Sequence, residues 1–395
     1  MSINYKSINR RIYFFIPMKT LGGVPILFLN IYDELKSVVN FGFIIYKNSE
    51  IYELLTYRNI DHILFLDNNL FFNSIKKIEN NDIIVITTIS VDIIKIFPKN
   101  PYLIFWVVFP ETIIEIFKIS FIKNYYLARK FIYILNKYNA IYVMDDNCNK
   151  HINNYYKCTP PYLPIPVKII ENKYLLKNHS NILTTNFSYI GRAQVWKIRP
   201  LIKLLIDLDK ILLYNTFFYI YTDDAFSFKK ALKDLTIEHI KLCFIEKFHI
   251  DKIIDHMLDN NVNLNFAMGT SALDTAKVGI PTILIDATYS KLPDNYKYLW
   301  LFDTQNYNLG SIIDSNFSNF AERAKHINMI MYDLITDNIN ISNKCYNYIF
   351  NHHNIIDISK SFINYSGISN LKYDNILFAI FVKFIRVTWK KIFHD

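Results

Sequence analysis

The sequence has few cysteines and no long hydrophobic run, and both absences narrow the class of protein. Its cysteines form neither a CxxC pair nor a spacing typical of a metal site; they are Cys148, Cys158, Cys243 and Cys345. Reduced thiols in a cytoplasmic protein are the simplest interpretation. Apolar runs remain shorter than the roughly 20 residues that a membrane-spanning helix needs, so the sequence predicts no transmembrane segment.

The amino terminus also lacks the features of a complete secretory signal. Two arginines precede an apolar run at residues 12–18, but the run contains Pro17 and stops at Lys19 without a small-residue cleavage site. We therefore predict that this run is the first β-strand.

No nucleic-acid-binding module is recognisable, although the net charge is +9. A basic balance favours anionic partners, and sugar nucleotides and anionic membranes are the two that we expect. Hydrophobic residues make up 51% of the chain and aromatic residues 16%, which indicates a packed protein. A chain of 395 residues is long enough for two domains, each with its own core.

The first part of the chain alternates strand-like and helical stretches, with a helix predicted at residues 25–39. Further strands are predicted at residues 41–46, 62–66, 83–88, 102–108 and 140–144. This alternation is typical of an α/β fold with a parallel sheet covered on both faces.

Open sheets of this kind bind ligands at the carboxyl ends of their strands. The paired glycines Gly22 and Gly23 follow the first strand, where a backbone can approach a ligand closely. Glu111 follows the nearly continuous apolar strand at 102–108, which makes it a candidate catalytic acid or base or a solvated carboxylate at a helix start.

A dense proline stretch at residues 159–166 is extended and stiff, so it predicts a domain boundary. The predicted domains are residues 1–160, residues 167–340, helices at 341–370 that cross back to the first domain, and a terminal helix at 371–395. After Ile285 the pattern is helical and polar to about residue 366.

The second α/β pattern begins with a strand at 187–190, which Gly191 and Arg192 follow directly. Lys197 comes five residues after Arg192, and a helix is predicted from Pro200 to Leu213. An arginine offers a planar fork to phosphate oxygens and a lysine a compact point charge.

Residues 262–286 are the most informative stretch. VNLNFAMGTSALDTAKVGIPTILID has the pattern of a buried strand, a small-residue turn, a helix and a second buried strand. Gly269 permits close backbone approach, and Thr270 and Ser271 are good capping residues. The N–H groups at such a helix start favour a phosphate, and Asp274 lies one turn further along.

These two segments resemble the donor-binding segments of glycosyltransferases with the GT-B fold, in which two Rossmann-like α/β domains face each other across a cleft. The resemblance is strongest to glycosyltransferase family 4, whose pattern is Glu-x-Phe-Gly-x-x-x-Leu-Glu-Ala-x-Ala-x-Gly-x-Pro. Residues 266–281 fall in register with it; Asp274 takes the place of the second acid and Phe266 that of the first. Arg192 and Lys197 match the family's Gly-Arg-(three or four residues)-Lys segment.

The resemblance implies that Arg192 and Lys197 hold the donor diphosphate. Charge builds on this group as the glycosidic bond breaks, so cations aimed at it stabilise the transition state. The glycines and hydroxyls of the two turns would contact the same phosphates, and Asp274 would accept hydrogen bonds from the ribose. The Gly22-Gly23 loop would shape the acceptor side.

Asp223, Asp224 and Glu246 follow two further predicted strands. The resemblance implies that the nucleotide lies near the ends of these strands, so each acid is expected either to contact the ligand or to cap a helix. Because cations already serve the diphosphate, we expect no metal and no cofactor other than the nucleotide-sugar substrate. The histidine that many family members use is not identifiable, and His62 and His151 are candidates by location only.

The implied function is transfer of a sugar from a nucleotide sugar to a bacterial cell-surface glycan, such as lipopolysaccharide, capsule or exopolysaccharide. Phe266 leaves open whether the anomeric configuration is retained or inverted. A nucleotide-sugar 2-epimerase of the same fold and a scaffold protein that has lost catalysis are the alternatives.

The carboxyl-terminal residues 376–393 have the pattern of a basic amphipathic helix, with Lys383, Arg386 and Lys390 at helical spacing. Such a helix is typical of an anionic membrane interface, and a packed terminal helix is the alternative. We expect peripheral association with the cytoplasmic face of the inner membrane, where a lipid-linked glycan acceptor is presented.

Overall fold

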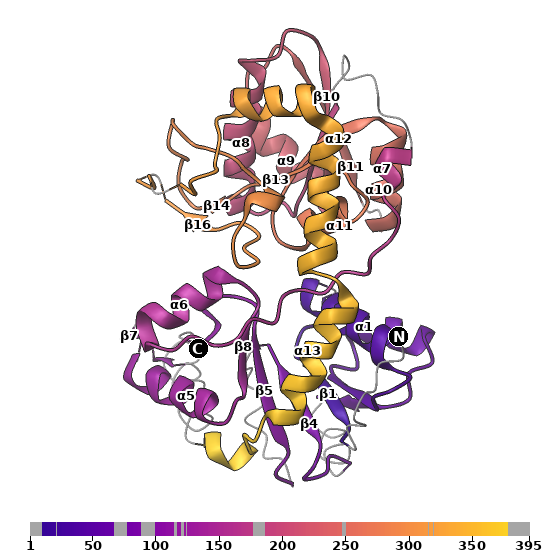
Figure 1. Ribbon diagram of the computed structural model, residues 1–395, viewed down its shortest axis with the longest axis vertical. Helices are drawn as coiled ribbons and strands as arrows, with labels where there is room; N and C mark the ends of the chain where they lie inside the picture. The colour runs from indigo at the N-terminus through magenta and orange to yellow at the C-terminus, as the bar shows by residue number, and fades with distance from the viewer. Residues whose placement is uncertain are drawn as a thin grey trace. The chain divides into compact units, whose positions relative to one another are not determined.

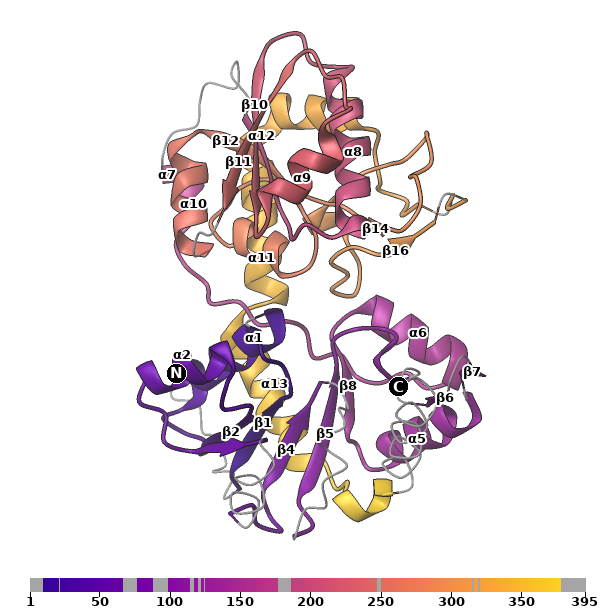
Figure 2. The ribbon, with the colours of Figure 1, turned by 180° about the vertical axis from the view of Figure 1, so that it is seen from behind.

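The structure is a computed structural model of the chain (Figure 1). It describes residues 10–20, 22–66, 77–87, 99–113, 117–119, 122–123, 125–176, 186–246, 250–314, 316–318 and 320–377. The chain forms two compact units, and each contains a six-stranded sheet. The first unit comprises residues 1–166 and 355–395, and the second comprises residues 167–354 (Figure 2).

The sheet of the first unit is entirely parallel, with the strand order β3-β2-β1-β4-β5-β8. Its strands are β1 (Ile12–Ile16), β2 (Phe41–Ile45), β3 (Ile63–Phe65), β4 (Ile83–Ile86), β5 (Tyr102–Val107) and β8 (Ile141–Val143). Each lies within a predicted range, so the strands expected from the apolar runs are confirmed. A small hairpin of β6 (Lys118–Ile119) and β7 (Ile122–Lys123) lies outside this sheet.

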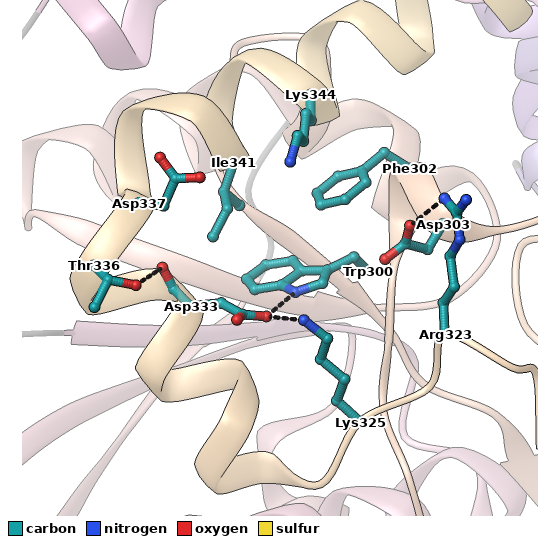
Figure 3. A pocket seen from close by; sticks show the side chains of 10 residues that line it. All are labelled: Trp300, Phe302, Asp303, Arg323, Lys325, Asp333, Thr336, Asp337, Ile341 and Lys344. Atoms are coloured by element: carbon teal, nitrogen blue, oxygen red, sulfur yellow. Dashed lines mark hydrogen bonds and ion pairs between the residues drawn. The ribbon is translucent and has the colours of Figure 1, made fainter.

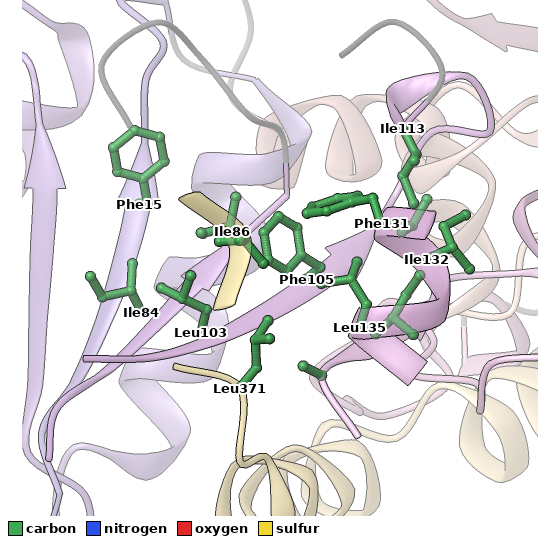
Figure 4. Packing of buried hydrophobic residues seen from close by; sticks show 14 of the residues in the cluster. Phe15, Ile84, Ile86, Leu103, Phe105, Ile113, Phe131, Ile132, Leu135 and Leu371 are labelled. Atoms are coloured by element: carbon green, nitrogen blue, oxygen red, sulfur yellow. The ribbon is translucent and has the colours of Figure 1, made fainter. Parts of the chain in front are cut away.

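Helices cover both faces of this sheet, which is why its strands are apolar throughout. Successive side chains of a strand point to opposite faces. Phe15 belongs to the core under α5 (Tyr125–Lys137) and α6 (Asp146–Tyr156), where Phe105 meets Phe131 with ring centroids 5.3 Å apart (Figure 4).

The other face packs on α1 (Gly23–Leu35) and α13 (Ile355–Ile368). Phe14 stacks on Phe28 of α1 at 4.4 Å and lies 5.9 Å from Phe362 of α13, as measured between ring centroids. The helix expected at 25–39 is thus present but shifted toward the amino end. The other helices among the described residues of this unit are α2 (Glu50–Tyr57) and the 3-10 helix η3 (Tyr373–Ile376).

The sheet of the second unit has the strand order β11-β10-β9-β12-β13-β15, and only β15 runs antiparallel to its neighbour. The strands are β9 (Asn186–Ile190), β10 (Thr216–Thr222), β11 (Ile240–Glu246), β12 (Val262–Ala267), β13 (Thr282–Leu284) and β15 (Leu299–Trp300). The helices are α7 (Lys173–Leu176), α8 (Val195–Asp209), α9 (Ala225–Leu232), α10 (Ile250–Asp259), α11 (Thr270–Ala276) and α12 (Ile327–His352).

The helix after β9 begins earlier than predicted. It starts at Val195, with Gln194 as its N-cap, so Pro200 lies inside the helix. A proline there forfeits one hydrogen bond to the preceding turn. Pro200 is buried, as are Leu201 and Leu204 of the same helix. As a consequence, Lys197 lies in the first turn of α8 rather than in a loop.

The prediction of helix directly after Ile285 was wrong. Residues 287–313 contain β14 (Ala287–Thr288), β15, the 3-10 helix η2 (Leu301–Asp303) and β16 (Ile312–Ile313). The physical reason is tertiary: Tyr298 and Trp300 are only 1% exposed because they pack along the edge of the sheet beside β13. Regular helix begins again only with α12.

The chain passes from the first unit to the second after Pro166 and returns at Ile355. Ile341 therefore lies on α12 within the second unit, and α13 belongs to the first. Of the predicted amphipathic segment, Ile376 and Leu377 are described and Ile376 is buried in the core of the first unit. The rest of that segment lies outside the described residues.

Candidate functional site

The two sequence segments singled out above lie at one topological position. The chain leaves β9 through α8 to β10 on one side of β9 and later enters β12 on the other side. The strand order thus reverses between β9 and β12, and open α/β sheets bind ligands at the carboxyl ends of strands at such a point. Gly191 and Arg192 follow β9 directly, and Gly269 follows β12 after one residue.

Gly191 is explained by the packing of the strand that precedes it. Its amide donates to the carbonyl of Tyr221 at 3.1 Å, which continues the pairing of β9 with β10. A Cβ at this position would overlap the buried ring of Tyr189. The Tyr189 hydroxyl donates to the carbonyl of Lys197 at 3.4 Å and so links β9 to the first turn of α8.

Arg192 lies close enough to Lys197 for its positive charge to act on the lysine. The pKa of Lys197 is lowered first by burial and then by the positive charge of Arg192, while Asp223 opposes the shift. The Lys197 ammonium also lies 5.0 Å from the centroid of the Trp196 ring. Two cations, one partly buried and one exposed, therefore stand near the Asp223 carboxylate at the ends of β9 and β10.

Asp223 holds the loop that carries these cations. Its Oδ1 accepts a hydrogen bond from the amide of Ala193 at 3.0 Å and one from the Thr222 hydroxyl at 3.3 Å. The sequence suggested a ligand contact or a cap for this residue. In the structure it ties the loop after β10 to the loop after β9.

The turn after β12 contains Gly269 with φ 65° and ψ −142°, a conformation that L side chains rarely adopt. A Cβ built on Gly269 would meet no atom within 4 Å, so the turn borders open space. Its amide donates to the carbonyl of Leu309 at 2.8 Å. The turn therefore faces open space, and the Gly269 amide is already engaged.

The predicted capping role of Thr270 and Ser271 was wrong. Gly269 is the N-cap of α11, no side chain caps the helix, and Thr270 and Ser271 form its first turn. The reason is the backbone conformation of Gly269, which starts the helix one residue earlier than a hydroxyl cap would. Both side chains are partly exposed at this edge of the unit.

Asp274 forms an ion pair with Lys277 one turn along α11, with 2.9 Å between Oδ1 and Nζ. Its side chain is 29% exposed and that of Lys277 is 14% exposed. Lys277 was not anticipated as its partner, although a spacing of three residues on a helix permits such a pair.

Phe266, which stands where the family 4 pattern has its first acid, is fully buried in β12. Its ring centroid lies 6.3 Å from those of Phe187 and Phe218 in the neighbouring strands. Position 266 thus belongs to the core of this unit.

Asp224 and Glu246 both accept hydrogen bonds from backbone amides in the first turn of α9. Asp224 is its N-cap and accepts from the amide of Ser227 at 3.0 Å, and Glu246 accepts from the amide of Ala225 at 2.6 Å. For Asp224 the cap alternative is confirmed. Glu246, which we expected beside the nucleotide, is engaged by α9 in this structure.

The remaining candidates belong to the first unit. Gly22 is the N-cap of α1 and Gly23 its first residue, directly after the loop from β1. Glu111 follows β5 in a turn at the carboxyl end of that strand. His62 precedes β3, so it lies at the amino end of the strand rather than at the ligand-binding edge.

Asp286 is a feature of the site region that the sequence did not suggest. It follows β13 and accepts hydrogen bonds from the Ser311 amide at 2.7 Å and from the Tyr296 hydroxyl at 2.9 Å. Burial raises the pKa of its carboxyl group despite these two bonds. The bonds fasten the segment around residue 311 next to Gly269.

Within the described part of the chain, no cluster of three or more His, Cys, Asp or Glu side chains could hold a metal ion. No helix in the ranges given above is long and apolar enough to cross a membrane.

No family model and no curated protein matches the sequence, but solved structures resemble the fold. Anabaena HepE in complex with UDP and glucose matches with a TM-score of 0.55 and 10% identity, over 90% of this chain and 99% of that one. The lipopolysaccharide outer core galactosyltransferase WaaB matches with a TM-score of 0.55 and 12% identity, over 90% of this chain and 98% of that one. An alpha-glucosyltransferase in complex with UDP-glucose and DNA matches with a TM-score of 0.52 and 10% identity, over 90% of this chain and 98% of that one. The chain thus has the GT-B fold of these glycosyltransferases.

Proposed function

We propose that the protein transfers a sugar from a nucleotide-sugar donor to a hydroxyl acceptor. The observation that carries this proposal is the juxtaposition of Arg192 and Lys197 beside Asp223, at the topological switch point of the second unit. The open space at Gly269 lies at the end of the adjacent strand. The GT-B fold and the resemblance of both segments to donor-binding segments of family 4 point to the same site.

In this mechanism the acceptor hydroxyl attacks the anomeric carbon of the donor sugar. The bond between that carbon and the diphosphate oxygen breaks, the diphosphate leaves with the electron pair, and the hydroxyl proton is released. Arg192 and Lys197 stabilise the charge that develops on the diphosphate, and they contribute most in the transition state. Burial of Lys197 strengthens its interaction with a phosphate, because a partly desolvated charge is screened less by water.

UDP-glucose is the first donor to test, because the similar structures of HepE and of the alpha-glucosyltransferase contain UDP or UDP-glucose. A cell-surface glycan is the acceptor that we propose, and the similarity to a lipopolysaccharide galactosyltransferase makes a lipopolysaccharide core the first choice.

Thermal denaturation with UDP, GDP and UDP-glucose tests the donor site. A ligand at a hundred times its dissociation constant adds about 2.7 kcal/mol to the free energy of unfolding. We expect stabilisation by UDP that is reduced in Arg192→Ala, because free UDP carries the full charge of the leaving group. Lys233→Ala, which removes an exposed lysine of the same unit, should retain the stabilisation. Absence of stabilisation by any nucleotide would contradict the proposal.

Product analysis then identifies the reaction. Release of UDP together with a lengthened acceptor supports transfer. An epimerised sugar nucleotide without acceptor would indicate an epimerase, and nucleotide binding without turnover would indicate a scaffold protein.

We also propose that residues 376–393 attach the protein to an anionic membrane, on the basis of their basic amphipathic pattern. The test is a chain that ends at Leu377, which keeps the buried Ile376. This chain should sediment with anionic vesicles less than the full chain, and equal sedimentation would contradict attachment through this segment.

A further inference from the structure

A pocket of about 470 Å³ lies in the second unit between β15, η2 and α12 (Figure 3). Its volume falls in the range of about 300–1,000 Å³ that is usual for small-molecule sites. None of the residues of the candidate donor site lines it. The pocket therefore needs an explanation of its own.

The floor of the pocket is apolar. The rings of Trp300 and Phe302 are nearly parallel, with an interplanar angle of 10° and centroids 5.8 Å apart. Ile341 of α12 lies beside them (Figure 3). Trp300 is almost fully buried, whereas Phe302 is partly exposed and presents the aromatic surface that a ligand can reach.

The rim of the pocket carries equal numbers of opposite charges. Asp303 pairs with Arg323 at 3.1 Å and Asp333 with Lys325 at 2.6 Å, and Asp333 also accepts from the Trp300 indole at 3.2 Å. The Lys344 ammonium lies 5.5 Å from the centroid of the Phe302 ring, and Asp337 also lines the pocket. Three carboxylates and three cations thus surround one aromatic floor.

A local distortion of α12 shapes one wall. Asp337 has φ −144° and ψ 33°, which interrupts the helix, and its Oδ2 accepts a hydrogen bond from the side-chain amide of Asn340 at 2.7 Å. Residues in such sparsely populated conformations are concentrated at ligand sites. The interruption leaves Thr336 and Asp337 at the pocket rather than on a continuous helical surface.

We propose that this pocket binds a neutral saccharide unit. An apolar face of the sugar ring would pack against Phe302, and its hydroxyl groups, which both donate and accept, would bond to the carboxylates and ammonium groups of the rim. A neutral ligand with both kinds of group suits a rim whose charges balance. A phosphate would meet three carboxylates and a cationic ligand three cations, so each is less well matched.

This inference goes beyond transfer from a nucleotide sugar, because it assigns a second carbohydrate site to the same unit. It does not depend on the donor site, since the two share no residue. A protein can pass the nucleotide test and fail the saccharide test, or the reverse.

The experiment is saturation-transfer NMR of the full chain with the methyl glycosides of glucose, galactose and N-acetylglucosamine, each as a separate probe. We expect saturation of at least one glycoside by the natural protein. Phe302→Ala should weaken that binding about tenfold, the change that corresponds to about 1.4 kcal/mol. Asp337→Asn removes a charged acceptor but keeps an oxygen for Asn340, so it tests the rim while the helix interruption is retained.

Phe217→Ala is the matched control, because Phe217 is also a partly exposed phenylalanine beside a lysine, with the Lys241 ammonium 5.1 Å from its ring centroid. Retained binding in this control and weakened binding in both pocket variants supports the site. No saturation of any glycoside by the natural protein, equal binding in all four proteins, or a preference of the pocket for inorganic phosphate that is lost in Lys344→Met would overturn it.

Discussion

The Asp223 carboxylate accepts a hydrogen bond from the amide of Ala193 at 3.0 Å, so the loop after β10 holds the loop after β9. The same carboxylate acts to raise the pKa of Lys197, whereas burial and the charge of Arg192 lower it, and the net shift is downward. Asp223 therefore has two opposing effects on an anionic ligand: it positions the cations and it repels the anion.

Two substitutions of Asp223 separate these effects. Asp223→Asn keeps an oxygen for the Ala193 amide and removes the negative charge, so we expect UDP to bind a few times more tightly. Asp223→Ala releases the loop, and we expect weaker binding of UDP by roughly 1–3 kcal/mol, the penalty of an unsatisfied group. Isothermal titration calorimetry measures both. Equal affinities for the two variants would show that Asp223 does not act through the loop.

Substitution of the cations should change turnover much more than stability. We expect Arg192→Ala and Lys197→Ala to lower kcat about 100-fold or more, because their interaction grows as charge develops on the leaving diphosphate. Asp274→Asn should instead weaken donor binding, by roughly 1–3 kcal/mol if Asp274 accepts from the ribose. Folded Arg192→Ala and Lys197→Ala proteins that transfer sugar at the natural rate would contradict the assigned site.

Lys197→Met should stabilise the fold while it abolishes function. The pKa of Lys197 is lower in the folded chain than in the unfolded chain, mainly because of burial. The charged form is thus unfavourable in the folded state; the penalty is present in full below the folded pKa and disappears as pH rises to the unfolded pKa. At pH 7 we expect an equal or higher melting temperature for Lys197→Met. A clear decrease would indicate a structural role.

Two glycines should respond to alanine in opposite ways. Gly269 has a positive φ of 65°, so Gly269→Ala should destabilise by about 1–3 kcal/mol. Gly367 lies on α13 with open space around its Cβ position, and Gly367→Ala should stabilise by about 0.5 kcal/mol. Urea denaturation compares them directly, and a Gly269→Ala protein as stable as the natural one would refute the conformational argument.

Placing the first acid of the family 4 pattern at position 266 should damage the protein. Phe266→Glu places a carboxylate between Phe187 and Phe218 and removes a buried ring, so we expect a loss of about 3–5 kcal/mol or more. Circular dichroism and denaturation check this. A stable Phe266→Glu protein with increased transfer would show instead that position 266 reaches the donor.

Activity should persist in EDTA, because we assign stabilisation of the diphosphate to Arg192 and Lys197. Turnover measured before and after chelation, and again after addition of magnesium or manganese, tests this. Complete loss that a metal restores would transfer the role to a bound ion.

The sequence by itself determined the strands and the class of fold. Apolar runs such as those of β1 and β5 are continuous because both faces of a parallel sheet are buried, and this constraint is visible along the chain. The spacing of Arg192 and Lys197 also placed both residues within one strand-to-helix connection, where the structure has them.

Only the tertiary structure decided which distant groups meet. The amide of Ala193 donates a hydrogen bond to Asp223, which lies 30 residues further along the chain. The amide of Ala225 donates to Glu246, which lies 21 residues further along. These bonds depend on the order and register of neighbouring strands, which no local pattern encodes. The stretch 287–313 was misjudged for the same reason: its strands form because Tyr298 and Trp300 find a buried place beside β13, whereas its polar residues alone suggested a helix. The periodicity of a segment shows which of its residues are buried. A binding site, in contrast, forms where the ends of several elements come together, and this depends on the tertiary structure.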